Sequence, residues 1–380
     1  MKFSRFLFLL AAAALLAAAC DPAPSDEIPD DDGKDKTGTV TTDWSDPSWY
    51  STNFWERTDR EKAGIRGPVK KWHVSTYTKY TEYEYDREGH LVKETRIDTG
   101  DASDTDGFNY TYDSAGHLVR KEYFSQFTGE GFEEYIEYEY GNTGKFVASE
   151  FFMMGPSIVD AHLGICKDLS RISEVNVQPL SSWFKEYTFT FNADGNLTVK
   201  VSSYSTEVGS EERLNESSYE YTYVYENGYP KSLDDPDLRF KLLNVTYYPN
   251  GMYKDFVYKE ENAYNYDTGW DTHTYRMLDN PRVLAVERFE LGGTPSYISL
   301  TPGRMVKTYD EHYDIIKNEE WYWEPNAVAP DGSEPTYTDT WRDFVYDKYG
   351  NWTTRIEHVI PRYTGEGYDA TVTRVFEYFE

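Results

Sequence analysis

The stretch Tyr83–Glu94, YEYDREGHLVKE, recurs 27 residues further on as Tyr110–Glu122, YTYDSAGHLVRKE. In both copies aromatic residues alternate with polar ones before an Asp, and a Gly follows three positions after that Asp. Alternation with a period of two is typical of a strand with one drier face. The Asp side chain can bond the backbone two residues on, and the Gly suits the left-handed residue after a type I turn. Each copy therefore predicts a β-hairpin.

Further copies of this pattern run to the end of the chain. Full copies follow at Tyr138–Glu150, Phe189–Val201 and Phe344–Glu357, shortened ones at Tyr223–Leu233 and Thr246–Phe256, and a worn one without the glycine at Lys307–Glu319. The residues predicted to form the repeated turns are Asp86, Gly89, Asp113, Gly116, Gly144, Gly195, Asp347 and Gly350. Recurrence at this scale indicates a repeat architecture in which hairpin follows hairpin.

Composition indicates a sheet that is partly wet on both faces. The chain has 35 Tyr, 20 Phe and 10 Trp but a mean hydropathy of −0.74, and Tyr packs its ring across strands while its hydroxyl reaches water. We predict an all-β fold in which tandem antiparallel hairpins form one long twisted meander sheet. A radial or closed arrangement of the same hairpins is the alternative. An open meander leaves two unpaired edges, which predicts a cap or a dimer.

The repeated motif carries a family resemblance. Tyr-Asp-x-x-Gly-x-Leu, present at residues 85–91 and 112–118, resembles the YD repeat of Rhs-like proteins, and the resemblance extends over roughly residues 64–380. It implies strands coiled into a shell, and the uneven copies resemble those of bacterial surface lipoproteins.

The N-terminus has the features of an exported, anchored protein. Lys2 and Arg5 precede an apolar run that is too short to cross a bilayer, so residues 1–19 are predicted to be a signal peptide. Cys20 ends a stretch that resembles a lipoprotein lipobox, which implies lipidation of Cys20. Residues 20–43 then form an acidic, Pro-rich tether. Ser25–Glu27 resembles a surface-export signal, which implies an outer-membrane lipoprotein exposed at the surface of a Gram-negative bacterium.

The rest of the chain divides into a cap and a repeat domain. Residues 44–66 are predicted to be a short helical cap, with a helix at Thr52–Gly64 and Trp49, Phe54 and Trp55 as anchors. Residues 67–380 form the repeat domain. An irregular insertion at 154–182 interrupts it and is predicted to contain a helical turn or a long loop at Asp160–Ser170.

Charge excludes one class of partner. The net charge is −29, and removal of Lys2 and Arg5 with the signal peptide gives −29 − 2 = −31. Phosphate backbones would repel such a chain, so nucleic acid is not an expected partner. The expected membrane contact is the lipid anchor.

No motif for nucleophilic, metal or phosphate chemistry occurs in the sequence. His162 and Cys166 have helical spacing, but nothing nearby completes a metal site or a nucleophile–base pair. His90 and His117 occupy a repeated turn position, which favours a structural role. We therefore predict no metal, no cofactor and no catalytic residue.

Carboxylate side chains offer two weaker candidates. Adjacent pairs such as Glu133–Glu134 and Glu319–Glu320 could suit a glycosidase, yet adjacent strand residues point to opposite faces. The acidic stretch Asp98–Gly107 could hold calcium in a loose loop site, but it does not fit an EF-hand.

Aromatic side chains are the remaining candidates for ligand binding. Trp321 and Trp323 lie on one predicted strand face, and Trp270 and Trp341 occur in neighbouring copies. Such rows suit stacking on sugar rings or on peptides, although they could equally form the drier face of the sheet.

These observations predict a non-enzymatic surface or outer-membrane lipoprotein whose repeat sheet binds an extracellular glycan or protein. One alternative is a hydrolase of extracellular polysaccharide that uses a carboxylate pair. A second alternative is a small relative of Rhs-type toxin shell proteins.

Overall fold

The structure is a computed structural model. It describes residues 54–380 apart from 76–78, 99–104, 127–131, 152–162, 208, 211, 236–239, 249–250, 252, 262–269, 277–282, 292–303, 311–313, 322–333, 336 and 360–366. Its helical elements are η2 (Phe54–Glu56) and α2 (Asp59–Lys62).

All remaining elements are strands. The first eight strands are β1 (Val69–Ser75), β2 (Lys79–Tyr85), β3 (Leu91–Asp98), β4 (Thr105–Tyr112), β5 (Leu118–Ser125), β6 (Glu133–Tyr140), β7 (Phe146–Phe151) and β8 (Leu163–Lys167). The middle strands are β9 (Leu169–Val177), β10 (Ser181–Phe191), β11 (Leu197–Glu207), β12 (Leu214–Glu226), β13 (Tyr229–Ser232), β14 (Phe240–Tyr247) and β15 (Tyr253–Glu261). The last are β16 (Trp270–Arg276), β17 (Val283–Leu291), β18 (Arg304–Tyr309), β19 (Ile315–Trp321), β20 (Tyr337–Tyr346), β21 (Trp352–Val359) and β22 (Tyr368–Tyr378). The prediction of an all-β fold built from tandem hairpins is confirmed.

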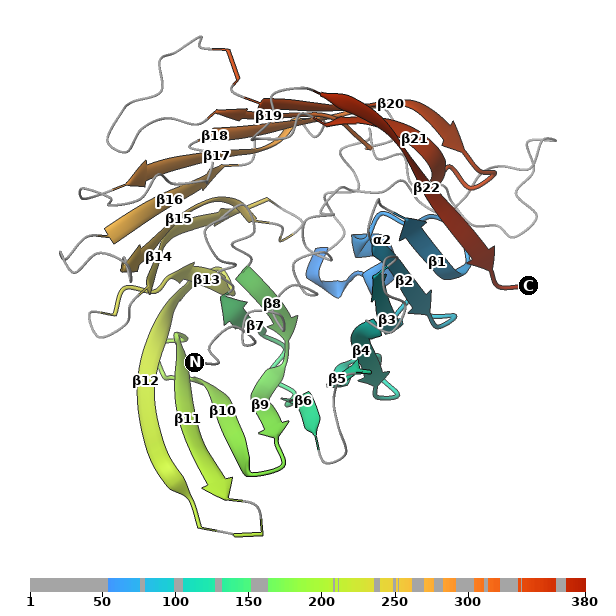
Figure 1. Ribbon diagram of the computed structural model, residues 1–380. Coiled ribbons are helices and arrows are strands. Elements are labelled where there is room, and N and C mark those ends of the chain that lie inside the picture. The colour runs from blue at the N-terminus through green and yellow to red at the C-terminus, as the bar shows by residue number, and fades with distance from the viewer. Residues whose placement is uncertain are drawn as a thin grey trace.

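The strands form one meander whose two ends meet. Within the sheet of 20 strands, neighbours in sequence pair antiparallel, and β6 pairs with β9 because the β7–β8 hairpin forms a separate sheet. The last strand, β22, pairs with β1, so the sheet is a closed ring. Strands β13 and β14 are joined through the Leu233–Leu242 bridge. Figure 1 shows the circuit of strands, with β7, β8 and α2 inside it. The expectation of two unpaired edges is therefore wrong, because the first and last strands satisfy each other's backbone groups.

The repeated turns have the geometry that their sequence requires. Backbone bonds join Asp86 N–H to the His90 carbonyl at 3.0 Å and Gly89 N–H to the Asp86 carbonyl at 3.2 Å, and the turns that begin at Asp113, Asn192 and Asp347 repeat this pair of bonds. The φ angles are 94°, 82°, 68°, 81° and 82° at Gly89, Gly116, Gly144, Gly195 and Gly350. A side chain would be strained there, so glycine is the residue that completes this turn.

The space inside the ring is filled by a hairpin and by large side chains. A ring of eight strands is about the size that its own side chains fill, and a wider ring needs additional filling. Here the β7–β8 hairpin supplies it, because Val147 and Ile165 pack with Leu197, Val199 and Leu242 in one buried cluster. A second cluster combines Ile65, which precedes β1, with residues of β1–β4 near the closure of the ring. Its buried members on these strands are Val69, Trp72, Tyr83, Tyr85, Leu91, Phe108 and Tyr110.

The N-terminal segment (residues 54–67) lies across the end of the ring where the repeated turns are. Arg60 N–H donates to the Gly89 carbonyl at 3.0 Å, and Trp55 Nε1 donates to the Gly251 carbonyl at 2.6 Å. Arg66 N–H donates to Asn351 Oδ1 at 2.8 Å, and Asn351 Nδ2 donates back to the Arg66 carbonyl at 2.8 Å. The segment therefore ties the first, a middle and the last turn together.

The helix predicted at Thr52–Gly64 is shorter than expected. It is divided into η2 and α2, and α2 begins after Thr58, whose side chain forms a capping box with Glu61. Gly64, with a φ of 67°, follows the end of α2. Trp49, one of the predicted anchors, lies outside the described residues.

The predicted irregular insertion at 154–182 is wrong where the structure describes it. Residues 163–167 and 169–177 are strands β8 and β9, and β10 begins at Ser181. Strand β9 pairs with both β6 and β10, so it is an ordinary member of the ring. His162 lies outside the described residues, and Cys166 pairs with Val147 across the β7–β8 hairpin rather than on a helix.

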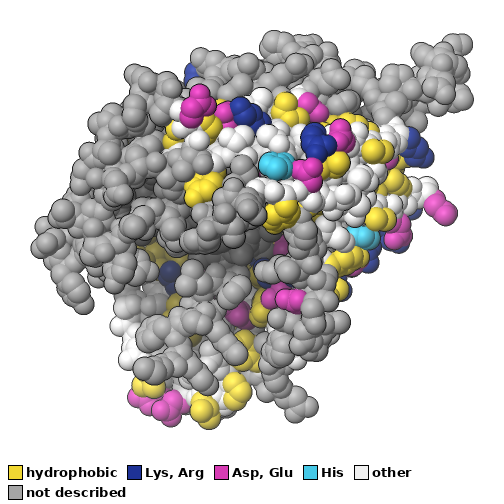
Figure 2. All heavy atoms as spheres, turned by 45° about the horizontal axis from the view of Figure 1, so that its top comes forward, with side chains coloured by type: hydrophobic (Ala, Val, Ile, Leu, Met, Phe, Trp, Pro, Cys, Tyr) yellow, Lys and Arg dark blue, Asp and Glu magenta, His cyan; other side chains and the backbone are white. Residues whose placement is uncertain are grey.

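The outer face of the ring mixes charges of both signs. On the side shown in Figure 2, acidic and basic side chains lie side by side among hydrophobic ones. Some of these opposite charges form ion pairs across neighbouring strands, namely Lys70–Glu377, Arg120–Glu137 and Arg342–Asp369. In the part of the chain that the structure describes, no helix is long and apolar enough to cross a bilayer.

Candidate functional site

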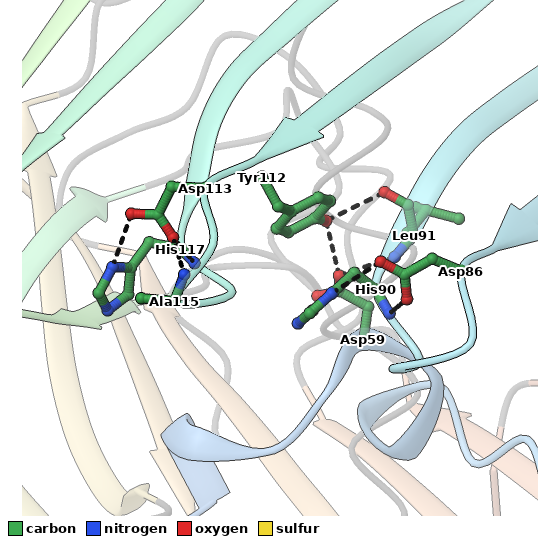
Figure 3. Close-up of polar contacts among 8 residues, drawn as sticks. All are labelled: Asp59, Asp86, His90, Leu91, Tyr112, Asp113, Ala115 and His117. Atoms are coloured by element: carbon green, nitrogen blue, oxygen red, sulfur yellow. Dashed lines mark hydrogen bonds and ion pairs between the residues drawn. The ribbon is translucent and has the colours of Figure 1, made fainter.

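The first repeated turn holds an Asp–His pair (Figure 3). Asp86 Oδ1 accepts the His90 backbone N–H at 2.9 Å, and Asp86 Oδ2 lies 2.9 Å from His90 Nδ1. The His90 ring stacks on Tyr112, with 4.6 Å between ring centroids. The Tyr112 hydroxyl lies 2.7 Å from Asp59 Oδ2 and 3.0 Å from the Leu91 carbonyl oxygen. The pair therefore joins the turn to the next hairpin and to α2.

The second turn repeats this arrangement. Asp113 Oδ1 accepts the backbone N–H groups of Ala115 and His117, and Asp113 Oδ2 lies 3.1 Å from His117 Nδ1. The His117 ring stacks on Tyr140 at 4.6 Å, and the Tyr140 hydroxyl donates to the Leu118 carbonyl at 2.9 Å. Both histidines are thus held by the turn Asp on one side and by an aromatic face on the other.

The degenerate copies preserve these contacts with other side chains. In three of them the fifth turn residue contacts an aromatic residue at or next to the end of a strand in a neighbouring hairpin. Lys145 Nζ lies 4.2 Å from the centroid of the Phe191 ring, Asn196 Oδ1 accepts the Tyr225 N–H at 3.0 Å, and Asn351 Nδ2 donates to the Tyr378 hydroxyl at 3.2 Å.

The missing turn Asp of the third copy is replaced from outside the motif. Asp168, which follows β8, accepts the Gly144 N–H at 2.5 Å and the Thr143 hydroxyl at 2.9 Å. The copy at 307–319, which lacks the glycine, retains the bond between the turn Asp and the fifth turn residue: Asp310 Oδ1 accepts the Asp314 N–H at 3.0 Å. The sequence motif is therefore weaker than the structural repeat.

Arginine and tryptophan side chains alternate across the strands where the ring closes. The Trp352 ring lies between two guanidinium groups, Arg374 at 3.8 Å and Arg355 at 4.4 Å from its centroid. Arg374 also covers Trp72 at 4.9 Å, and Arg355 also covers Trp341 at 5.3 Å. Burial lowers the pKa of Arg374 to about 9. This Arg–Trp ladder links β20, β21, β22 and β1, so it belongs to the closure of the ring.

The four tryptophans that the sequence singled out do not form one exposed row among the described residues. Trp321 is buried, and Trp341 is half-buried with its Nε1 donating to Glu357 Oε1 at 2.7 Å. The two lie beyond opposite ends of the β19–β20 pairing. Trp270 begins β16, and its side chain lies outside the described part, as does the whole of Trp323.

The adjacent carboxylate pairs are divided between two environments. Glu133 is exposed, while its neighbour Glu134 is half-buried on the opposite face of β6. Glu319 forms an ion pair with Lys317 at 2.6 Å, and the buried Glu320 accepts from Asn318 Nδ2 at 3.0 Å. Neither adjacent pair can act as two facing carboxyl groups.

The acidic stretch Asp98–Gly107 falls largely outside the described residues. Its last three residues belong to β4. Among the residues that the structure does describe, no group of three or more His, Cys, Asp or Glu side chains could hold a metal ion.

A polar and aromatic row that sequence reasoning did not identify lines the inner face of the ring. Strand register places Tyr123 opposite Glu134, Glu134 opposite Asn176, and Asn176 opposite Trp183, on β5, β6, β9 and β10. Paired residues share a face. The face is the inner one, because Tyr187, four residues beyond Trp183, pairs with the buried Val201.

Glu134 is the unusual member of this inner row. Burial is the main cause that raises its pKa to about 7 from an ordinary value of 4.5; the neighbouring Glu174 raises it further, while a bond from Asn176 opposes the shift. Within the described part of the chain, no lysine or arginine forms an ion pair with Glu134. Burial also raises the pKa of Glu174, and the Lys185 ammonium counteracts that rise.

The inner face beside this row is open to solvent on the longest strands. Tyr219 pairs with Val201 and therefore points inward, yet 47% of its surface is exposed. Ser217, two residues before it, is also exposed. Strands β10, β11 and β12 have 11, 11 and 13 residues, and Figure 1 shows them extending beyond the hairpins beside them.

Comparisons with known proteins give no assignment for this chain. No family model and no curated protein matches it. Among solved structures it is similar to TcdB2–TccC3 without its hypervariable C-terminal region, at 12% identity and a TM-score of 0.26 over 74% of this chain and 14% of that one. It is also similar to a porin-like protein from Bacteroides uniformis, at 12% identity and a TM-score of 0.21 over 82% of this chain and 98% of that one.

A third similar structure is TcdB2–TccC3–Cdc42, at 11% identity and a TM-score of 0.21 over 78% of this chain and 18% of that one. The chain thus spans less than a fifth of the toxin-complex chains that it matches. At these TM-scores the likeness assigns neither a family nor a function.

Proposed function

We propose that this chain is a non-enzymatic lipoprotein, anchored in the outer membrane through Cys20 and exposed at the cell surface, that binds an extracellular glycan or protein on its closed repeat sheet. The observation that carries the proposal is the exposed inner face of the long strands, where Tyr219 and Ser217 face inward and remain open to solvent. A closed ring with an open inner face offers a ligand more contact area than a convex surface does.

The Asp–His pairs do not argue for catalysis. Asp86 and Asp113 each accept backbone N–H groups of their own turn, and each histidine stacks on a tyrosine. A general base must reach the proton that it removes. These histidines instead have one ring nitrogen on the turn Asp and one ring face covered.

Anchoring is tested in a Gram-negative host that expresses the full chain. Metabolic labelling with palmitate should mark the protein, and Cys20→Ser should abolish the label. Protease added to intact cells should degrade the labelled protein. An unlabelled protein, or a labelled one that survives protease until the cells are broken, would contradict surface anchoring.

Binding is tested with the full chain in detergent micelles against arrays of extracellular glycans and surface proteins. The proposal predicts saturable binding to at least one class. Binding to neither class on either array would overturn it.

A hydrolase of extracellular polysaccharide is a second candidate, and one observation favours it. Glu134 has the raised pKa of a general acid, and Glu174 is its diagonal neighbour on the adjacent strand. Diagonal neighbours have Cα atoms about 7–8 Å apart, and side chains of this length can bring their carboxyl groups to the separations of about 5–10 Å found in glycosidases. Release of reducing ends from a bound polysaccharide, lost in Glu134→Gln, would establish this candidate in place of the first.

A further inference from the structure

We infer that the inner face of β6, β9 and β10 is a subsite for a neutral glycan, in which Trp183 stacks on a sugar ring and Asn176 and Glu134 bond its hydroxyl groups. The inference rests on the proposed function, because it names the ligand class and the residues that would hold it. It does not use the four tryptophans that the sequence singled out.

The three side chains form a continuous row. Glu134 pairs with Asn176, and Asn176 pairs with Trp183, on three adjacent strands. Strands lie about 4.8 Å apart, so the row spans about 10 Å, which suits two consecutive sugar rings. The strands fix the order of carboxyl, amide and indole, so the row is preorganised.

The row can be reached from solvent. Glu134, Asn176 and Trp183 are half-buried rather than sealed in the core. On β12, which β11 separates from β10, Tyr219 and Ser217 point to the same side and are exposed. The hydrophobic filling of the ring is nearer the turns, where Leu197, Val199 and Tyr223 are buried.

The chemistry of the row fits uncharged hydroxyl groups. An amide donates and accepts hydrogen bonds, a carboxyl group accepts them in either protonation state, and an indole offers a flat apolar face. Glu134 and Glu174 would repel an acidic glycan. Lys185 pairs with Glu174, and its Nζ lies 4.7 Å from the centroid of the Tyr187 ring. The inner face therefore already has an ammonium group beside the row. A neutral glycan therefore fits better than an acidic or a basic one.

The chain provides matched controls for each residue. Glu133 is the exposed neighbour of Glu134, and Phe184 is the neighbour of Trp183 that stacks on Tyr204 on the outer face. Alanine at either control removes the same kind of group without touching the inner row.

The experiment is calorimetric titration of the full chain in micelles with neutral hexaoses, namely cellohexaose and mannohexaose, and with deacetylated chitohexaose as a cationic probe. We expect a neutral hexaose to bind and Trp183→Ala and Glu134→Ala each to weaken it at least tenfold. Phe184→Ala and Glu133→Ala should stay within twofold. Circular dichroism and melting temperature report whether each variant is folded, and Asn176→Asp serves as a milder second variant of the row.

Several outcomes would overturn the inference. An equal loss of hexaose affinity in the inner-row variants and in the outer-face controls would contradict the subsite. Binding of the cationic probe alone would contradict it as well. If no hexaose binds while the protein array gives a partner, the inference fails and the proposed function stands. If neither array nor hexaose gives binding, both fail.

Discussion

Two glycines show how differently single residues are constrained in this sheet. Gly195 has a φ of 81°, and a Cβ built on it would meet nothing within 4 Å, so only backbone strain opposes a side chain. Gly107 lies within β4, and a Cβ there would come within 2.0 Å of the Glu94 carbonyl oxygen. That oxygen belongs to the neighbouring strand, so it cannot move without disturbing the β3–β4 pairing.

We therefore expect Gly195→Ala to lower the free energy of unfolding by about 1–2 kcal/mol, the strain of a left-handed residue. Gly107→Ala should cost more than about 3 kcal/mol because overpacking displaces backbone. Urea unfolding followed by tryptophan fluorescence compares them. Equal midpoints for the two variants would show that the β3–β4 contact is looser than described.

Glu134 should give the protein a distinct pH dependence. The folded chain holds the Glu134 proton more tightly than the unfolded chain, with a pKa of about 7 against 4.5. The resulting stabilisation is complete below about pH 4.5 and is lost as the pH rises through about 7. After allowance for solvent screening it is on the order of 1–2 kcal/mol.

Glu134→Gln should therefore flatten the decline in the free energy of unfolding between pH 4.5 and 7, and Glu133→Gln should leave it unchanged. Melting temperatures across this range provide the measurement. A parallel decline in wild type and Glu134→Gln would assign the effect to other carboxyls, Glu174 first.

The inner row could be predicted only in part. Glu134 follows the same alternation as Ile136, Tyr138 and Tyr140, so the sequence places a carboxyl on the drier face of its strand. Its partner Asn176 lies in the segment that was predicted to be an irregular insertion. Trp183 follows that segment, and no register between its strand and the others could be predicted from the sequence. Register across three strands decides the row, and a single sequence does not contain that register.

At the scale of elements, the N-terminal segment depends on one asparagine. Asn351 exchanges two bonds with the Arg66 backbone and also contacts Tyr378, whose hydroxyl bonds Asp347. Asn196 has the same turn position in another copy but accepts only the Tyr225 N–H from a neighbouring hairpin.

Asn351→Ala should cost about 2–3 kcal/mol, since it leaves buried backbone groups of Arg66 unpaired, and Asn196→Ala about 1 kcal/mol. Hydrogen exchange should quicken across residues 54–67 in Asn351→Ala only. Unchanged exchange there would mean that the segment is held by its other contacts.

The hairpins themselves were predictable because each has a local signal of alternation, Asp and Gly. Strands β8 and β9 were not, since LGICK is too short an apolar run to distinguish strand from helix, and the apolar residues of LSRISEVNV do not alternate with a period of two. Asp168, between β8 and β9, takes the place of the turn Asp that the third copy lacks.

At the scale of the whole molecule, closure joins residues about 300 positions apart. Trp72 on β1 and Phe376 on β22 stack at 6.1 Å, and Arg374 lies between Trp72 and Trp352. A cation–π contact contributes about 0.5–1 kcal/mol at an exposed site and about 2 kcal/mol when it is desolvated. The sequences of β1 and β22 contain no local signal that identifies the other as a pairing partner. A meander could therefore be predicted from the sequence, but its closure could not.

The most direct test of the closed ring uses the pairing of His73 with Val375 across β1 and β22. Cysteines at both positions, in a chain whose Cys20 and Cys166 are replaced by Ser, would have Cα atoms about 4.5–5.5 Å apart, within the range of a disulfide. Cysteines at Val224 and Val375 provide the control, since both are exposed but lie on strands that do not pair. The closed ring predicts an intramolecular disulfide in the first protein after mild oxidation and none in the second. No cross-link, or a disulfide that joins two chains, would show that β1 and β22 are open edges.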